Sequence, residues 1–381
     1  MRIVSSVISI HSSDTAGVCS SLYELGGMTV VHDASGCNST YATHDEPRWY
    51  SHASRTYISA LTESDMILGN DERFIDNVVK AVSQVSPCPF IAICGSPVPL
   101  MVGTDFEALA REIELQSGVP VLALHTNGMN SYLKGVNEAL TAFAGRFLPD
   151  ALPKSTRKVN ILGATPLDFS VNGQVESICS FLTEKGFEVN TVWSMNTSFE
   201  ALKKTTEASV NLLVSSAGLE LARFFETEFQ TPFVIGIPMG RSFGSRCITA
   251  LRKAVETGES SSPLLEREGN GKACIIGETV WASSLACALQ AERGIAARVL
   301  NPLEEELAFL VEGDLTVPDE KSVENAFAES SSIFGDPLYQ AVAPAGVHFY
   351  GIPHEAFSGR CFRKNMKNYC GENFEKEFII C

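Results

Sequence analysis

The chain has 381 residues, of which 45% are hydrophobic and 19% are charged, and its formal net charge at pH 7 is −16. This length and apolar fraction predict a folded protein of two or three domains, with no apolar run near the roughly 18 residues of a membrane span. The negative charge argues against nucleic acid and against an anionic membrane surface as partners, because both require clustered Lys and Arg.

The cysteines and the first residues indicate the compartment. The 11 cysteines are scattered and odd in number, which favours reduced thiols in the cytoplasm over a disulfide scaffold. The opening segment MRIVSSVISI has one Arg and no small-residue cleavage site after its apolar stretch. We therefore expect a strand there and not a signal peptide.

The first block of the chain, residues 1–150, alternates short apolar runs with amphipathic stretches. Phe74, Val78 and Val82 recur at four-residue intervals and predict a helix over residues 71–82. Asp71 and Glu72 fall in the first turn of this helix, where its dipole favours anions. Strands are predicted at residues 29–32, 65–69, 90–94 and 120–125.

Two further blocks repeat the same alternation, over residues 151–262 and over residues 263–381 with a C-terminal tail. Their predicted strands are residues 159–163, 188–192, 210–215 and 233–237, then 273–277, 297–300, 332–335 and 347–350. The pattern predicts an α/β protein of three Rossmann-like domains with parallel sheets. Ligands bind beyond the carboxyl ends of such strands, which directs attention to the loops GNDER, CGSPVP, HTNG, GATPLD and SSAG.

Several common cofactor motifs are missing from the sequence. It has no G-x-x-x-x-G-K-[ST] phosphate loop, no G-x-G-x-x-G after a strand and no H-E-x-x-H zinc helix. We therefore expect no ATP binding by this chain, and its reactivity must have another source.

Three cysteines stand out by their positions. Cys19 lies near the start of the first helical stretch, Cys37 lies on a Gly-Cys turn after the first clear strand, and Cys94 ends a strand. Thiolates gathered at one edge of a sheet suit an iron–sulfur cluster. The alternative is that all three are small buried core residues, as free cysteines often are. Zinc is disfavoured because no C-x-x-C pair exists.

The order of motifs resembles the nitrogenase component 1 superfamily, from about residue 14 to about residue 360. The family-like segments of the first block are ELGGMTVVHDASGCNST, HDEPRW, LTESDMILGNDERFIDNVVKA, ICGSPVPLMVGTDFEALAREIE and HTNGMNSYLKG. Those of the later blocks are NILGATPLD, TEASVNLLVSSAGLELA, TPFVIGIPMG, IIGETVWA and GDPLY. The short chain is most similar to small members, related to dark-operative protochlorophyllide reductase and nickel-sirohydrochlorin diamide reductive cyclase subunits.

The resemblance implies a cofactor and partners. Cys37 and Cys94 match cluster-ligand positions of the family, and the third ligand is Cys19 or Asp14, since the family uses Asp as an unusual ligand. The implied cofactor is an iron–sulfur cluster, 4Fe–4S by preference. The implied partners are a P-loop iron protein that uses the ATP, and a second copy or a paralogous subunit in a dimer or larger oligomer. We expect the iron protein to dock near residues 32–48 and 94–105, with Glu46 and Arg48 as contact charges.

Polar residues outside the cysteine region give further candidates. His354, in PHEAFSGR after the last predicted strand, could donate protons or bind metal in a cleft between domains, and Arg360 could hold a substrate carboxylate. Alternatively, His354 and Glu355 cap the following turn and Arg360 forms a pair at an interface. Three more candidates each have a structural alternative: His32 and His44 could tune the cluster, and Arg241 could bind an anion at a helix start.

Two functions follow from this interpretation. The first is an oxidoreductase component that passes low-potential electrons from the iron protein to a small-molecule substrate in the interdomain cleft. The second is a non-enzymatic scaffold that assembles or transfers a metal cluster or a metallated tetrapyrrole. Fold membership does not decide between them, because function depends on the site. His354, as a proton donor, favours the enzyme.

Overall fold

The computed structural model describes residues 11–34, 40–41, 44–303 and 309–378. The chain forms two compact units. The N-terminal unit comprises Ser12–Asp150 together with Trp193–Lys203, and the C-terminal unit is built mainly from Ala151–Val192 and Lys204–Cys381. Among the described helices, none is long and apolar enough to cross a membrane.

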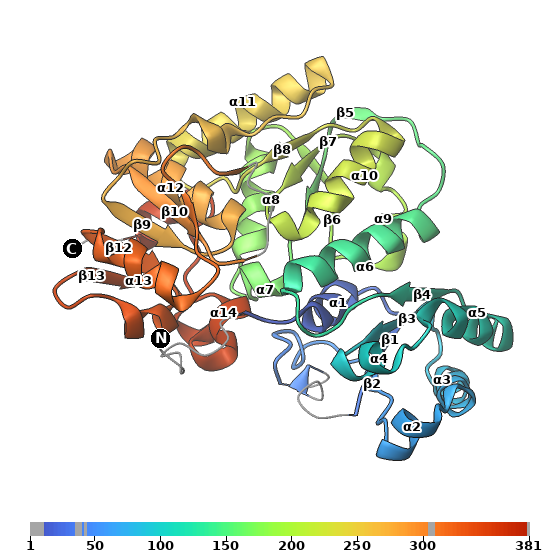
Figure 1. Ribbon diagram of the computed structural model, residues 1–381. Helices are drawn as coiled ribbons and strands as arrows, with labels where there is room; N and C mark the ends of the chain where they lie inside the picture. The colour runs from blue at the N-terminus through green and yellow to red at the C-terminus, as the bar shows by residue number, and fades with distance from the viewer. Residues whose placement is uncertain (1–10, 35–39, 42–43, 304–308, 379–381) are drawn as a thin grey trace. The chain divides into compact units, whose positions relative to one another are not determined.

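The N-terminal unit contains one parallel sheet with the strand order β2-β1-β3-β4 (Figure 1). Its elements are α1 (Asp14–Leu22), β1 (Met28–His32), β2 (Thr56–Ile58), α2 (Glu63–Leu68), α3 (Asp71–Gln84), β3 (Ile91–Gly95), α4 (Pro97–Val102), α5 (Phe106–Ser117), β4 (Val121–Leu124), α6 (Tyr132–Phe147) and α9 (Phe199–Leu202).

Side chains along each strand point alternately to the two faces of the sheet, and each face packs against different helices. One face of the sheet, which includes Ile91 and Ile93, packs on α3 and α5 in a core with Phe74 and Val78. Successive strand residues point to opposite faces, so Cys94 points away from α3 and α5 and toward α1. The predicted helix over residues 71–82 is confirmed, with its apolar stripe buried.

The C-terminal unit contains two more parallel sheets, with strand orders β6-β5-β7-β8 and β11-β10-β9-β12-β13. The elements of the first are β5 (Ser155–Leu162), α7 (Pro166–Phe169), α8 (Gln174–Glu184), β6 (Glu188–Val192), η2 (Thr205–Glu207), β7 (Ala208–Leu213), η3 (Ser216–Gly218), α10 (Leu219–Phe229), β8 (Phe233–Ile235) and α11 (Arg241–Thr257). Those of the second are η4 (Pro263–Glu266), β9 (Ala273–Ile276), α12 (Thr279–Arg293), β10 (Ala297–Asn301), β11 (Leu315–Thr316), α13 (Glu320–Ala328), β12 (Ser332–Gly335), η6 (Pro337–Val342), β13 (His348–Gly351), α14 (Glu355–Ser358), η7 (Gly359–Cys361), η8 (Arg363–Asn365) and α15 (Asn373–Glu377).

The prediction of an α/β fold with parallel sheets is confirmed, and each sheet lies within one of the three predicted blocks. The C-terminal tail returns to the second block, since Met239 forms isolated bridges with Cys370 and Gly371. The domain boundaries at residues 150 and 262 stay predictions.

One predicted strand is wrong. Residues 65–69 belong to the end of helix α2, and the second strand of the sheet is Thr56–Ile58. The Thr62 hydroxyl accepts a hydrogen bond from the Asp65 amide while the Asp65 carboxylate accepts one from the Thr62 amide, a capping box that starts a helix. The apolar Ile67 and Leu68 that suggested a buried strand are 73% and 79% exposed.

Candidate functional site

The carboxyl edge of the first sheet has a switch point between β1 and β3, because the chain continues from these adjacent strands to opposite sides of the sheet. Ligands of open parallel sheets bind at such a point. Cys94 lies there, paired in register with Val31, one residue before the end of β3. The Ser96 hydroxyl donates a 2.5 Å hydrogen bond to Asp33, which joins the two segments that leave the switch point.

Two of the three predicted cluster cysteines meet at this edge. Cys19 on α1 and Cys94 on β3 are both buried, with 3% and 0% exposure, and they are near enough for the Cys19 thiol to act on the pKa of Cys94. The neighbouring Cys19 thiol, followed by burial, raises the pKa of Cys94, while the Thr126 side chain opposes the shift. Iron is bound by thiolate, so iron loading at this pair must release protons.

Close helix packing fixes the position of Cys19. Helices α1 and α6 approach so closely that a Cβ atom at Gly17 would lie 2.2 Å from the Tyr132 carbonyl oxygen. On the strand side, the Thr15 and Thr126 hydroxyls donate hydrogen bonds of 3.1 and 2.7 Å to the Gly95 carbonyl. The two thiols are therefore carried by backbone that glycine contacts and threonine hydroxyls hold in place.

We expect Gly135→Ala to destabilise the protein by about 3 kcal/mol, because overpacking against backbone cannot be relieved by a rotamer change. A Cβ atom at Gly135 would lie 1.9 Å from the Asp14 carbonyl oxygen. Gly145, in the same helix, has nothing within 4 Å of its Cβ position, so Gly145→Ala should stabilise the helix by roughly 0.5–1 kcal/mol. The measurement is the free energy of unfolding of both variants in urea. Equal changes in the two variants would contradict the close packing of α1 on α6.

Both carboxylate oxygens of Asp14 accept hydrogen bonds from within the protein. Its Oδ1 accepts hydrogen bonds from the Thr15 and Gly128 amides at 2.7 and 2.8 Å. Its Oδ2 accepts from the Asn127 amide at 3.0 Å and from the Asn130 side chain at 3.2 Å. Both oxygens thus hold the HTNG loop against the start of α1, which favours Cys19 over Asp14 as the third ligand.

Cys37 lies outside the described residues. Among the residues that are described, no group of three His, Cys, Asp or Glu side chains is arranged to hold a metal ion. The Cys19–Cys94 pair fits a cluster in the chemistry of its donors and in its burial at a switch point. Its remaining ligands would have to come from the Cys37 segment or from another chain.

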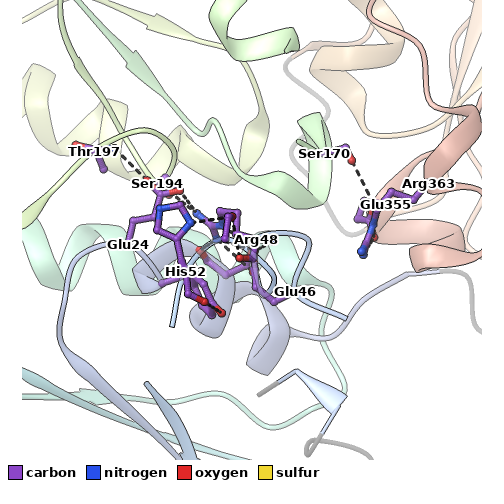
Figure 2. A network of polar contacts seen from close by, with 12 residues as sticks. Glu24, Glu46, Arg48, His52, Ser170, Ser194, Thr197, Glu355 and Arg363 are labelled. Atoms are coloured by element: carbon purple, nitrogen blue, oxygen red, sulfur yellow. Dashed lines mark hydrogen bonds and ion pairs between the residues drawn. The ribbon is translucent and has the colours of Figure 1, made fainter. Parts of the chain in front are cut away.

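The segment HDEPRW forms a buried ion network in the N-terminal unit, so the expected role of Glu46 and Arg48 as docking charges is wrong. Their side chains are 4% and 3% exposed. Figure 2 shows both residues within the network of polar contacts. The Arg48 guanidinium donates to Glu46 at 2.6 Å, to Glu24 at 3.0 Å and to the Ser194 carbonyl at 2.7 Å. The guanidinium group has five N–H donors, so Arg48 can bind several residues that are distant from one another in the sequence.

A second polar centre lies in the C-terminal unit, where the switch points of its two sheets meet. Glu278 follows β9 and caps α12, with its carboxylate accepting from the Val280 and Trp281 amides. The same carboxylate accepts from the Ser216 amide and hydroxyl at 3.0 and 2.7 Å, after β7 of the other sheet. Burial, and then the nearby Asp168 carboxylate, raise the pKa of Glu278.

His354 belongs to this second centre. It is 6% exposed, and its Nε2 lies 3.4 Å from Oδ1 of Asp168. The Asp336 carboxylate accepts from the His354 amide at 2.9 Å and so fixes the backbone that carries the ring. His354 occupies the position before α14, but its side chain makes no capping hydrogen bond. The capping alternative is therefore not observed, and the sequence reasoning missed Asp168 and Glu278.

Arg360 lies in η7 and is exposed, whereas the partly buried Arg363 forms an ion pair with the buried Glu355. The Glu355 carboxylate also accepts a 3.5 Å hydrogen bond from Ser170, as Figure 2 shows. The role of Arg360 as a substrate-binding residue stays a prediction.

The remaining candidates have structural partners. His32 bonds to the Ser59 hydroxyl at 2.9 Å and stacks on Phe74, and burial lowers its pKa to about 4. His44 packs edge-on against Trp49. Arg241 lies 3.4 Å from Glu372, and the amide at the start of α11 donates to Glu292, a carboxylate of the protein itself. These contacts agree with the structural alternative at all three positions.

Residues 25–276 match the protein family described as Nitrogenase component 1 type Oxidoreductase. The chain therefore belongs to this family. It is 27% identical over 197 residues to a subunit of the light-independent protochlorophyllide reductase of Picosynechococcus sp., a match that covers 49% of this chain and 39% of that protein. It is 26% identical over 187 residues to the nitrogenase iron-molybdenum cofactor biosynthesis protein NifE of Sinorhizobium fredii, a match that covers 48% of this chain and 36% of that protein. The matches thus span well under half of these relatives.

Solved structures of nitrogenase have the same fold. The structure described as "Nitrogenase Cp1 at pH 6.5" aligns with a TM-score of 0.71 at 16% identity, covering 99% of this chain and 93% of that one. That described as "Nitrogenase Cp1 at pH 5" aligns with a TM-score of 0.66 and covers 89% of that chain. At this identity the likeness establishes the fold alone.

Proposed function

We propose that this chain is the cluster-binding component of a nitrogenase-like reductase, with Cys19, Cys37 and Cys94 as ligands of an iron–sulfur cluster. The observation that carries the proposal is the buried Cys19–Cys94 pair at the switch point of the first sheet. The nine described cysteines have no disulfide, consistent with work in a reducing compartment such as the cytoplasm.

In this proposal, the residues around Cys19 and Cys94 hold the cluster and shield it from solvent. A bound cluster would supply one-electron transfer at low potential. Cys19 and Cys94 lose their protons on loading, and the contacts of Thr15, Thr126 and Asp14 keep the two sulfur atoms in place. Three protein thiols are one fewer than the usual four ligands, which favours a dimer or a larger assembly in which a neighbouring chain supplies the fourth.

The exposed apolar side chains of α2 and α4 form a surface suited to the electron-delivering partner. We call this the α2–α4 patch, and it consists of Ile67, Leu68, Leu100, Met101 and Val102. Helix α4 begins three residues after Cys94, and α2 packs against it. A docked partner would therefore be close to the cysteine pair. Exposed Glu63, Asp71 and Asp105 flank the patch in sequence and would attract a basic surface on a P-loop iron protein.

Met101→Asp should slow ATP-dependent reduction by at least about tenfold while leaving the iron content unchanged, because a charge in the centre of an apolar interface is costly. Met101 is 84% exposed, so the folded chain should tolerate the substitution. Leu115→Asp is the matched control, since Leu115 is 78% exposed at the far end of α5. Equal rates for both variants would contradict docking at the α2–α4 patch.

The function is tested by mixing the anaerobically reconstituted chain with a reduced P-loop iron protein. We expect bleaching of the cluster absorption only when ATP is added, and no ATP binding by the isolated chain in calorimetry, because it has no phosphate loop. Tight ATP binding by the isolated chain, or the same reduction by a ferredoxin without ATP, would overturn this scheme.

A scaffold function is the second candidate, and the match to NifE, described as a cofactor biosynthesis protein, favours it. A scaffold holds its cluster without turning over a substrate. Transfer of the intact cluster or of a metallated tetrapyrrole to an acceptor protein, with no substrate-dependent reoxidation of the reduced chain, would support the scaffold over the reductase.

A further inference from the structure

The second polar centre contains His354, whose ring is shielded from solvent. Both ring nitrogens of His354 are buried, and neither makes a hydrogen bond to any described residue. The Asp168 carboxylate, 3.4 Å from Nε2, is close enough for an ion pair. Burying an imidazole in this way costs free energy unless the ring has a charge partner or a ligand.

Four carboxylates belong to this centre, and each has other partners; Oδ2 of Asp168 accepts a 3.4 Å hydrogen bond from the Thr165 hydroxyl. Glu278 accepts four hydrogen bonds, two of them from Ser216. Asp336 accepts from the Leu338 and His354 amides and from the Ser358 hydroxyl, and Glu355 is paired with Arg363. Asp168 is the one whose oxygen approaches the ring, while Phe357 and Trp281 pack edge-on against it, at centroid distances of 4.9 and 6.2 Å.

We propose that Asp168 and His354 form an acid–base dyad that supplies protons for the reduction, an inference that rests on the proposed function. Asp168 is the positioning residue: its negative charge, 3.4 Å from Nε2 of His354, favours the tautomer that is protonated there and leaves Nδ1 as the proton-exchanging atom. The substrate gains an electron delivered by the reduced iron protein and takes the Nδ1 proton from the imidazolium. His354 becomes neutral, Asp168 is unchanged, and water returns the proton to Nδ1.

Asp168 and His354 lie near the switch points of both sheets of the C-terminal unit, where parallel sheets bind ligands. Asp168 is in α7, directly after β5 at the switch point of one sheet, and Glu278 follows β9 at the switch point of the other. Glu278 joins the two loops through Ser216, so the positions of Asp168 and His354 are set by one network. A proton donor held in this way is fixed before the substrate arrives, which is what general acid catalysis requires.

The test is NMR of the full-length chain labelled in its histidine ring nitrogens, with His354→Gln used to assign the His354 signals. We expect one tautomer, protonated at Nε2, to exceed the other by at least about tenfold in the native chain, because the Asp168 carboxylate favours a proton on the nearer ring nitrogen. Asp168→Asn should abolish this preference and Asp168→Glu should largely restore it. Asp336→Asn is the matched control, because Asp336 contacts the His354 backbone and not its ring.

Each outcome decides the proposal. Protonation at Nδ1, no tautomer preference, or a preference unchanged in Asp168→Asn would overturn the dyad, and so would the same loss in Asp336→Asn. ATP-dependent bleaching of the cluster in the native chain is measured separately, because the dyad acts after electron delivery. If the native chain does not bleach, the proposed function fails, while the tautomer result still decides whether the dyad exists.

Discussion

Cys94→Ala is expected to remove nearly all iron from the reconstituted protein. The Cys94 side chain is fully buried at the switch point, and the Cys19 thiol beside it raises its pKa. Loss of one thiolate leaves an iron atom of a cluster without its full set of ligands. The iron content after anaerobic reconstitution, divided by the protein concentration, is the measurement. Cys19→Ala and Cys37→Ala should behave in the same way.

The matched control for this experiment is Cys274→Ala. Cys274 is also a buried strand cysteine, 1% exposed on β9, but it is in the C-terminal unit. Both substitutions remove one sulfur atom from a parallel sheet, so their packing costs should be similar, and only Cys94→Ala should affect iron. Asp14→Asn should keep its iron, because the Asp14 oxygens are occupied by protein donors. Iron loss in Asp14→Asn with full iron in Cys19→Ala would reverse the ligand assignment.

Arg48→Met is expected to destabilise the protein by about 3–5 kcal/mol, the usual cost of leaving buried charges without their partner. The substitution keeps an apolar stem but removes the guanidinium between Glu46 and Glu24. It also removes the donors to the Ser20 and Ser194 carbonyls, at 2.6 and 2.7 Å. The measurement is unfolding in guanidinium chloride. The slope of the unfolding free energy against denaturant concentration should be the same in the variant and the native chain.

Arg146→Met provides the comparison for Arg48. Its ion pair with Glu114 has the same chemistry at 2.6 Å, but the two side chains are 49% and 39% exposed. Solvent screens such a pair, so we expect a loss of at most about 1 kcal/mol. A loss for Arg48→Met as small as that for Arg146→Met would show that the HDEPRW network does not hold the N-terminal unit together.

The regular elements of the fold followed from the sequence because their signals are local. Alternating apolar runs and amphipathic stretches predicted the parallel sheets, and the Glu188–Val192 and Ser332–Gly335 strands have the predicted bounds. The strand over residues 65–69 failed because a capping box at Thr62 outweighs the apolar run that follows it. The prediction that strand ends collect functional residues stays a prediction, with Cys94 near the end of β3 and Cys19 on α1 close to it.

The missed residues depend on contacts between distant parts of the chain. GATPLD and SSAG were recognised as loops at strand ends, but only the fold brings Asp168 beside His354 and Ser216 beside Glu278. The burial of Arg48 depends on Glu24 and Ser194, which are 24 and 146 residues away in the sequence. A charged residue in a polar segment is usually exposed, so the sequence favoured a surface position.

Anaerobic iron and sulfide analysis of the native chain tests the central claim most directly. After purification without oxygen, or after reconstitution with iron and sulfide, the protein should be brown, contain iron and acid-labile sulfide in equal amounts, and bleach with dithionite. A colourless protein that takes up no iron, although its Cys19 and Cys94 thiols are reduced, would contradict the assignment of this chain as a cluster-binding component.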